Sequence, residues 1–383
     1  MTAAPLFSLF CATWWTGALA VLLGSAALAA AGSLFQRRHR EDAAPPLSVI
    51  VPVRENSPEL APALASLFSQ SYPDFEVIVS AVEEPSPAIE NARAVAARYP
   101  GISASFITRD PRAAENPKIN NLALPIAEAR HDLIVVKDAN IRLKPERLAE
   151  MASLLAGGTG LVASIPVGIE PRNFPAEIEC AGMNGYVARF LLAASALGLG
   201  FGIGATMLFS RQDFERAGGI AHIARSIGED HAIAKMLSGI GRKTILSGTV
   251  EQIIGRRRVS DCWRRQLRWA VCRRCETPLV FHAELAASPL AAALAGAGGA
   301  NMIGISASSV FLGTIAVWIA ADMLLAALKG WPVSWRSPLA SLCFIIGFPL
   351  LWLQARLASR ISWGGASFPI HRPAKMPAFE RKT

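Results

Sequence analysis

The sequence predicts an α/β domain with a mostly parallel sheet, held between apolar helices at the two ends of the chain. Short β-branched runs alternate with segments of helical periodicity between residues 47 and 136. Apolar stretches occupy residues 5–35, 303–327 and 338–355. The composition is 52% hydrophobic and 17% charged with a mean hydropathy of +0.34, which is more apolar than an ordinary soluble domain.

The chain is also basic, with a formal net charge of +9 at pH 7. An anionic membrane surface suits a basic and apolar chain better than nucleic acid does. No recognisable nucleic-acid module accompanies the charge, so we expect no nucleic-acid partner. Cys272 and Cys275 form a CxxC without the second pair that a zinc site needs, and reduced thiols are expected.

Residues 1–45 are predicted to form a transmembrane anchor and a linker. The uncharged run 5–35 is long enough to cross a bilayer. The basic cluster Arg37–Arg40 follows this run. By the positive-inside rule, the chain from residue 37 onward then lies in the cytoplasm. A cleaved signal peptide is the less favoured alternative, because no basic residue precedes the apolar run.

The first half of the catalytic domain, predicted over 46–255, alternates strand and helix. The run Leu133–Val136 is short and β-branched, which is typical of a buried parallel strand. A dinucleotide-binding fingerprint is missing after the first strand, so that class is disfavoured. The predicted strands are 47–53, 75–80, 105–107 and 133–136, and the helices are 58–70, 87–98 and 119–129.

The second half is less regular. Its predicted elements are helix 145–155, strand 161–166, helix 176–197, strand 200–209, helices 211–217 and 227–237, and a strand pair over 243–254. Glycines punctuate the strand 200–209, where the backbone can approach a ligand closely.

The carboxyl-terminal part returns to the membrane. Residues 256–288 are predicted as amphipathic interfacial helices, rich in Arg and Trp. Residues 289–358 form a membrane region, in which 289–302 are re-entrant or membrane-adjacent and two stretches span, for three spans in all. Asp322 is the one charge inside these spans and is a functional candidate, with helix capping as the alternative. Residues 359–383 are a basic cytoplasmic tail.

Acidic turns follow the predicted strands. Glu83-Glu84 follows strand 75–80, Asp138 follows strand 133–136, and Glu229-Asp230 opens a helix. Open α/β sheets bind ligands at the carboxyl ends of their strands, where a carboxylate can hold a divalent cation and the cation a diphosphate. A plain turn or helix cap is the alternative for each. Sugar transfer from a nucleotide donor needs these carboxylates, one of them as a general base.

The motifs resemble those of the ceramide glucosyltransferase family, glycosyltransferase family 21, which is close to family 2. Asp138-Ala139-Asn140 is similar to its second acidic motif and Glu229-Asp230 to its third. The residues from Arg265 to Trp269 fit its RxxRW motif. Other similar segments are Asn116–Leu122, Ala217–Gly219 and Ile361–Trp363, so the resemblance covers roughly 45–365.

This resemblance implies a GT-A (Rossmann-like) fold, a UDP-sugar donor, a divalent cation (Mg²⁺ or Mn²⁺) and a lipid acceptor in the bilayer. It makes Asp230 the catalytic base and Asp138 the ligand of both donor and metal. The other implied donor-site residues are Glu83, Lys118 and Asn140, where Glu83 stands in place of the usual Asp. The implied residues of the motif that shapes the donor or acceptor site are Arg265, Gln266, Arg268 and Trp269.

The implied reaction is inverting transfer of glucose from UDP-glucose to the primary hydroxyl of ceramide, by a multi-pass enzyme of a bacterial inner membrane with a cytoplasmic catalytic domain. N-acetylglucosaminyl transfer to a hopanoid or another lipid polyol is the first alternative, and Asn140 favours ceramide over it. A processive polysaccharide synthase would be longer and have more spans. A catalytically inactive membrane scaffold predicts no metal dependence and no loss on changing Asp230.

Overall fold

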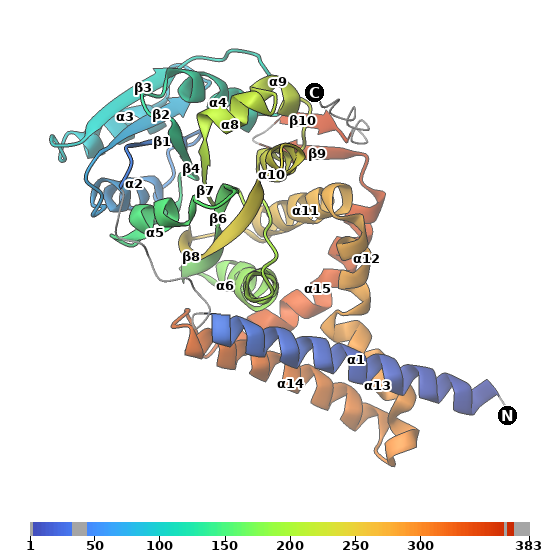
Figure 1. Cartoon of the computed structure of the whole chain (residues 1–383). Coiled ribbons are helices and arrows are strands. Elements are labelled where there is room, and N and C mark those ends of the chain that lie inside the picture. The colour runs from blue at the N-terminus through green and yellow to red at the C-terminus, as the bar shows by residue number, and fades with distance from the viewer. Residues whose placement is uncertain (1–2, 33–43, 364–365, 371–383) are drawn as a thin grey trace, which may run out of the picture. The chain divides into compact units, whose positions relative to one another are not determined.

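The computed structural model describes residues 3–32, 44–363 and 366–370 (Figure 1). Its contacts divide the chain into two compact units. The sheet unit consists of residues 36–167, 197–255 and 359–383, and the helical unit of residues 1–35, 168–196 and 256–358. The chain therefore passes more than once between the two units.

The sheet unit contains an eight-stranded sheet with the order β3-β2-β1-β4-β7-β6-β8-β5. The strands are β1 (Leu47–Pro52), β2 (Phe75–Ala81), β3 (Ser103–Thr108), β4 (Leu133–Lys137), β5 (Ile141–Arg142), β6 (Thr159–Pro171), β7 (Thr206–Ser210) and β8 (Lys243–Gly255). The pairs among β3, β2, β1 and β4 are parallel, whereas β4–β7, β6–β7 and β5–β8 are antiparallel. The α/β prediction is confirmed, and the parallel part is the four-strand half that the sequence pattern marked most clearly.

Helices cover both faces of the parallel strands. Helices α2 (Leu60–Phe68), α3 (Pro87–Ala96) and α5 (Arg147–Leu154) share one buried core with the side chains of Val49, Val77 and Val135. Successive side chains of a strand point to opposite faces, so Ile50 and Ile78 point the other way. On that second face α4 (Pro117–Glu128) contacts β1 and β2. The unit also contains α8 (Arg211–Arg216), α9 (Gly219–Ile223) and α10 (Glu229–Gly239).

Three local predictions for this unit were wrong or incomplete. Residues 200–205 form no strand, and β7 begins only at Thr206. The predicted strand pair over 243–254 is one long strand, β8, in which Gly248 takes a left-handed φ of 86° as local bends in strands do. An antiparallel hairpin of β9 (Arg360–Trp363) and β10 (Ala366–Pro369) lies within the predicted basic tail, of which residues 371–383 are outside the described part of the chain.

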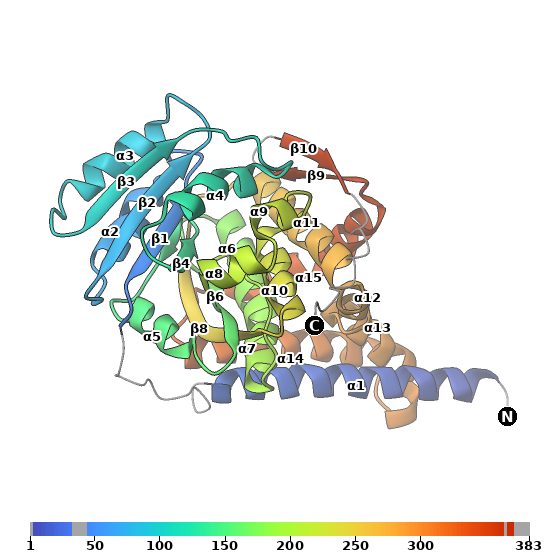
Figure 2. The same ribbon diagram turned by 45° about the horizontal axis from the view of Figure 1, so that its top comes forward.

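The helical unit is built from helices. They are α1 (Ala3–Ala31), α6 (Phe174–Cys180), a π-helix (Ala181–Ala188), α7 (Arg189–Ala196), α11 (Val259–Glu276), α12 (Pro278–Ala286), α13 (Pro289–Gly299), a short 3₁₀ turn (Ala300–Ile303), α14 (Ala307–Leu328) and α15 (Ser337–Leu357). Of these, α1, α14 and α15 are long and apolar. Helices α1, α13 and α14 lie side by side (Figures 1 and 2). A Cβ at Gly299 would lie 2.8 Å from the backbone nitrogen of Ala12, so this glycine lets α13 approach α1 closely.

Three helices are long and apolar enough to cross a membrane, namely Pro5–Ala31, Ala307–Leu328 and Ser337–Leu357. This agrees with the three predicted spans. Helices α12 and α13 form a pair bent by 45°, which would add a fourth span if the pair crosses as one. Residues 289–302, predicted as re-entrant or membrane-adjacent, belong to the second half of that pair.

Candidate active site

A buried lysine joins three elements of the sheet unit. Lys118 lies in the first turn of α4, which Asn116 caps by accepting a hydrogen bond from the Lys118 backbone N–H at 2.9 Å. The Lys118 Nζ contacts Asp138 Oδ1 at 2.6 Å, just beyond the end of β4. It also contacts Glu229 Oε1 at 2.5 Å, in the first turn of α10. The sequence pattern predicted Lys118 and Asp138 as site residues, and the structure brings them into direct contact.

Asp230 is held by the backbone beside this cluster. Its Oδ2 accepts a hydrogen bond from the Gly204 N–H at 2.9 Å, and its Oδ1 accepts one from the His231 N–H at 2.8 Å. A Cβ at Gly202 would overlap the carbonyl oxygen of Asp230. The glycines of 200–205 therefore do bring backbone close to other groups, as their pattern indicated, but Gly202 and Gly204 lie against the acidic turn of α10 and Gly200 against the Thr244 backbone of β8.

Burial and charge shift the pKa values of the cluster. Burial disfavours the ionised carboxylates and raises the pKa of both Glu229 and Asp230. Burial also opposes the charge of Lys118, but the carboxylates of Asp138 and Glu229 more than offset this and raise its pKa. A second lysine lies beside these three carboxyl groups, because Lys137 Nζ donates to the Asp138 backbone carbonyl at 3.3 Å, and burial lowers the pKa of Lys137 to about 7.

The two other predicted donor-site residues, Asn140 and Glu83, have different surroundings. Asn140 is tied to β8, because its Oδ1 accepts a hydrogen bond from Gln252 Nε2 at 3.3 Å and its backbone carbonyl one from the Ile253 N–H at 3.0 Å. Glu83 is exposed in the turn after β2, a strand separated from β4 by β1. Glu83 is therefore open to solvent at the sheet edge rather than part of the buried cluster.

A divalent cation fits this site only together with a substrate. Among the described residues no group of three or more His, Cys, Asp or Glu side chains could enclose a metal ion. The Asp138 side chain is about one-third exposed, at 32%. Mg²⁺ and similar ions are often bound through one or two carboxylates and the phosphates of a substrate. The carboxylates present therefore suit an ion that is also bound by a diphosphate, rather than an ion bound by protein ligands alone.

The RxxRW residues lie on α11 in the helical unit. Arg265 Nη1 contacts Glu179 Oε1 of α6 at 2.6 Å, and its guanidinium lies 5.7 Å from the centre of the Trp269 ring. The fully buried Glu179 also faces Arg257 Nε at 3.5 Å. Burial raises the pKa of the Glu179 carboxyl, but the two arginines outweigh it and lower the pKa overall. Gln266 is buried on the same helix.

Two members of these clusters were missed as site residues. Glu229 was noted only as part of an acidic pair, although its contact with Lys118 is the shortest in the cluster. No sequence motif marks Glu179, because it stands 86 residues before Arg265 in a segment without an acidic turn. The available signal was a pair of glutamates, Glu177 and Glu179, in the largely apolar predicted helix 176–197.

The comparison with known families decides the affiliation of the chain. A sequence model described as glycosyl transferase family 21 matches residues 12–376. The chain belongs to glycosyltransferase family 21. The fold prediction is confirmed with it, since the sheet unit is a mixed α/β domain and apolar helices flank it in sequence.

Family-21 relatives share part of the chain. "Ceramide glucosyltransferase 1" of Caenorhabditis elegans is 26% identical over 220 residues, which are 56% of this chain and 47% of the relative. The ceramide glucosyltransferase of Komagataella phaffii is 31% identical over 99 residues, which are 25% of this chain and 19% of the relative. The chain therefore spans about half the length, or less, of the curated relatives it matches.

A solved structure gives a weaker match. The mannosyltransferase PcManGT of Pyrobaculum calidifontis, solved with GDP-Man and Mn²⁺, has 17% sequence identity and a TM-score of 0.49. The match covers 90% of this chain and 99% of that chain.

Proposed function

We propose that this chain is an inverting membrane glycosyltransferase that moves glucose from UDP-glucose to the primary hydroxyl of ceramide. The observation that carries the proposal is the cluster of Asp138, Asp230 and the buried Lys118 and Glu229 in a chain of family 21. The sugar and the lipid rest on the similarity to ceramide glucosyltransferases.

Asp230 acts as the general base in this proposal. Its two oxygens are oriented by the N–H groups of Gly204 and His231, and each oxygen keeps a lone pair for a further hydrogen bond. The acceptor hydroxyl gives its proton to Asp230 while its oxygen attacks the anomeric carbon of the sugar. The bond to UDP breaks in the same step, so the configuration at that carbon inverts. Burial raises the pKa of Asp230 and makes the carboxylate a stronger base.

Asp138 and Lys118 contribute to binding the diphosphate of the UDP-sugar donor. Asp138 would hold a Mg²⁺ or Mn²⁺ ion, which when bound neutralises the charge of the leaving UDP. Lys118 keeps Asp138 and Glu229 oriented and offsets part of their charge. Glu83 and Asn140 are assigned to the nucleotide part of the donor, because both belong to motifs that follow strands of the sheet.

The RxxRW residues supply positive charge and an aromatic surface. Arg265 and Arg268 can donate charge-assisted hydrogen bonds to phosphate oxygens. Glu179 limits the orientations of Arg265, and Trp269 offers a ring against which that guanidinium rests. Gln266 completes the motif from the buried side of α11.

The membrane location belongs to the same proposal. The three apolar helices would anchor the enzyme in a bacterial inner membrane, which gives direct access to a lipid acceptor. The basic cluster after α1 would keep the sheet unit on the cytoplasmic side, where nucleotide sugars are made available.

Product analysis tests the substrates. Membranes containing the protein are supplied with UDP-glucose, UDP-N-acetylglucosamine, ceramide and a hopanoid polyol, and lipids are identified by mass spectrometry. We expect hexosyl-ceramide with the β configuration, formed only without a metal chelator and absent in Asp230→Asn. Detection of an N-acetylhexosaminyl hopanoid would show that the donor is UDP-N-acetylglucosamine and the acceptor a hopanoid, in place of the two proposed substrates. No transfer by a folded protein, with or without Mg²⁺, would refute the proposal.

A further inference from the structure

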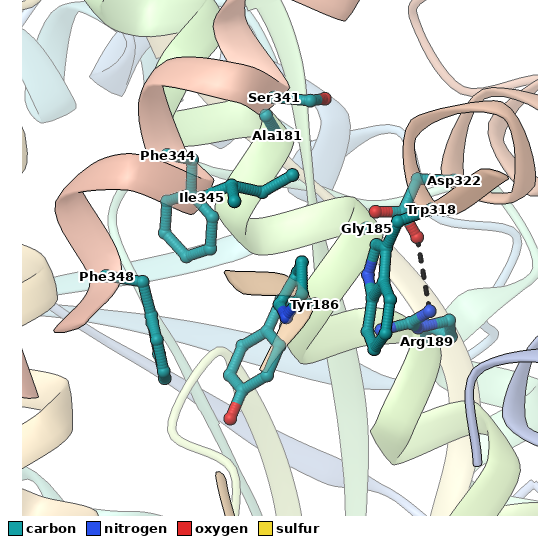
Figure 3. A pocket seen from close by; sticks show the side chains of 11 residues that line it. Ala181, Gly185, Tyr186, Arg189, Trp318, Asp322, Ser341, Phe344, Ile345 and Phe348 are labelled. Atoms are coloured by element: carbon teal, nitrogen blue, oxygen red, sulfur yellow. Dashed lines mark ion pairs between the residues drawn. The ribbon is translucent and has the colours of Figure 1, made fainter. Parts of the chain in front are cut away.

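A second polar site lies among the apolar helices of the helical unit, separate from the residues assigned to catalysis. Arg189, the first residue of α7, is 0% exposed, and its Nη1 lies 3.4 Å from Asp322 Oδ1 of α14 (Figure 3). Asp322 is the only charged residue in the 22 residues of α14. Ionisable groups inside a spanning helix are rare and commonly functional.

This ion pair leaves hydrogen-bonding capacity unused. Among the described residues, the Nε, Nη1 and Nη2 atoms of Arg189 and the Oδ1 atom of Asp322 have no hydrogen-bond partner. The guanidinium instead rests near the rings of Phe190 and Trp318, with centroid distances of 4.9 and 5.4 Å. Buried polar groups without partners are costly in an apolar surrounding, so a further partner is expected beside the pair.

A pocket beside the pair has room for such a partner. Its free volume is about 20 Å³, enough for one small polar group, since a water molecule needs roughly 10–15 Å³ on this measure. Arg189 and Asp322 stand on one side of the pocket and the rings of Tyr186, Phe344 and Phe348 on the other (Figure 3). The pocket is therefore mostly apolar, with the buried ion pair behind one wall.

The local backbone is adapted to this arrangement. The pocket wall includes the π-helix Ala181–Ala188, a rare geometry that is frequent at functional sites. A Cβ at Gly185 would lie 2.8 Å from Asp322 Oδ2, and one at Gly182 would overlap the ring of Phe344. The two glycines thus allow α14 and α15 to place an acid and a ring against the π-helix.

We propose that this pocket binds the hydroxyl or amide group of a neutral membrane lipid. Arg189 donates to the oxygen of that group, and Asp322 accepts from its O–H or N–H. The pair is neutral as a whole, so a phosphate would meet the repulsion of Asp322 and a cation that of Arg189. The small volume admits a hydroxyl or amide but not a phosphorylated headgroup, and the rings contact the adjoining hydrocarbon.

Photo-crosslinking tests the proposal on the full chain in phosphatidylcholine nanodiscs. The probe is a ceramide that carries a diazirine and an alkyne, and labelled peptides are mapped by mass spectrometry. We expect labelling of peptides that contain Tyr186, Trp318 or Phe344. Unlabelled ceramide should reduce it in proportion to its excess over the probe, whereas the same excess of phosphatidylglycerol should not.

A double variant removes the polar end without leaving a lone charge. Arg189→Met with Asp322→Leu replaces the ion pair by apolar side chains, a change that buried pairs often tolerate. We expect labelling to fall about fivefold or more in it. The control Asp261→Asn with Arg264→Gln, which removes an exposed pair on α11, should label as the wild type does.

The possible results distinguish which class of lipid, if any, binds in the pocket. Labelling that phosphatidylglycerol competes away, or that is unchanged in the double variant, would overturn the proposal, as would a pocket that ceramide never labels. The competition on wild-type protein decides the matter if the double variant does not fold. A raised KM for ceramide in the double variant would identify the lipid as the acceptor, and an unchanged KM as another neutral lipid. Because labelling needs no turnover, it remains informative if the proposed sugar transfer fails.

Discussion

Replacing Lys118 by Met should destabilise the sheet unit strongly. The Lys118 side chain is 10% exposed and bridges Asp138 and Glu229, whose side chains are 32% and 7% exposed. Removing one partner of a buried ion pair costs about 3–5 kcal/mol, because it leaves an uncompensated charge. The pair with Glu229 supplies most of this, since the pair with Asp138 is partly screened by solvent.

The expected size of the effect can be measured as a melting temperature. For a domain of 150–250 residues about 1 kcal/mol shifts Tm by roughly 2–4 °C, so Lys118→Met should lower Tm by about 6–20 °C. The raised pKa of Lys118 means that its stabilising effect is fully present below the ordinary value of 10.5 and is lost only as the pH rises through the higher folded value. The full effect is therefore expected at pH 7, and it should shrink as the pH falls, because Glu229 and Asp230, whose pKa values burial raises, then take up protons in the variant.

Thermal unfolding of the purified protein in detergent, followed at several pH values, measures this difference. Arg216→Gln is the matched control, because Arg216 is exposed and Asp213 keeps its contact with Arg242 at 2.7 Å. The control should cost less than about 1 kcal/mol. A Tm for Lys118→Met within the range of the control, or a shift that is independent of pH, would refute the reasoning about the buried cluster.

Three further predictions follow from the contacts of the site. Glu179→Gln removes the charge between Arg257 and Arg265 and should lower stability by about 3–5 kcal/mol in denaturant unfolding; an effect below about 1 kcal/mol would exclude a stabilising pair. Burial raises the pKa of Asp230 above its ordinary value of 3.8, so the kcat of the wild type should fall as the pH drops through this raised pKa. The acidic limb of the pH profile of kcat should therefore lie above pH 3.8, and a limb at 3.8 would contradict the role of Asp230 as the base. Gly202→Ala would press on the Asp230 carbonyl and should cost about 1–3 kcal/mol, whereas Gly239→Ala, with nothing within 4 Å of its Cβ, should be tolerated; equal melting temperatures would argue against the close approach.

The sequence was sufficient for the parts of the fold that local patterns determine. The run Leu133–Val136 is a largely buried strand, as predicted, but β4 continues through Lys137, whose side chain is fully buried, before Asp138 follows its end. Apolar length alone predicted the three helices that can span a membrane. These features depend on neighbours in sequence, so no knowledge of packing was needed.

The contacts that build the site depend on residues far apart in sequence. Lys118 forms an ion pair with Glu229, 111 positions later in the chain. No local sequence pattern predicts this contact. The glycines at 200–204 gave the correct signal of close approach but the wrong element, because a glycine-rich run can be an irregular segment as readily as a strand. The π-helix at Ala181–Ala188 was predicted as ordinary helix, and its close contacts with Asp322 and Phe344 join residues more than 130 positions apart in sequence.

The central claim is that Asp230 is the base of a glycosyl transfer, and the rate of Asp230→Asn tests it most directly. Asn keeps the shape and can still accept the Gly204 hydrogen bond through its carbonyl oxygen, but it cannot take up the proton of the acceptor. With UDP-glucose and ceramide, and with a melting curve that shows a folded variant, kcat should fall by about 10²–10⁴-fold while the KM for each substrate changes little. A kcat within about tenfold of the wild type would contradict the assignment.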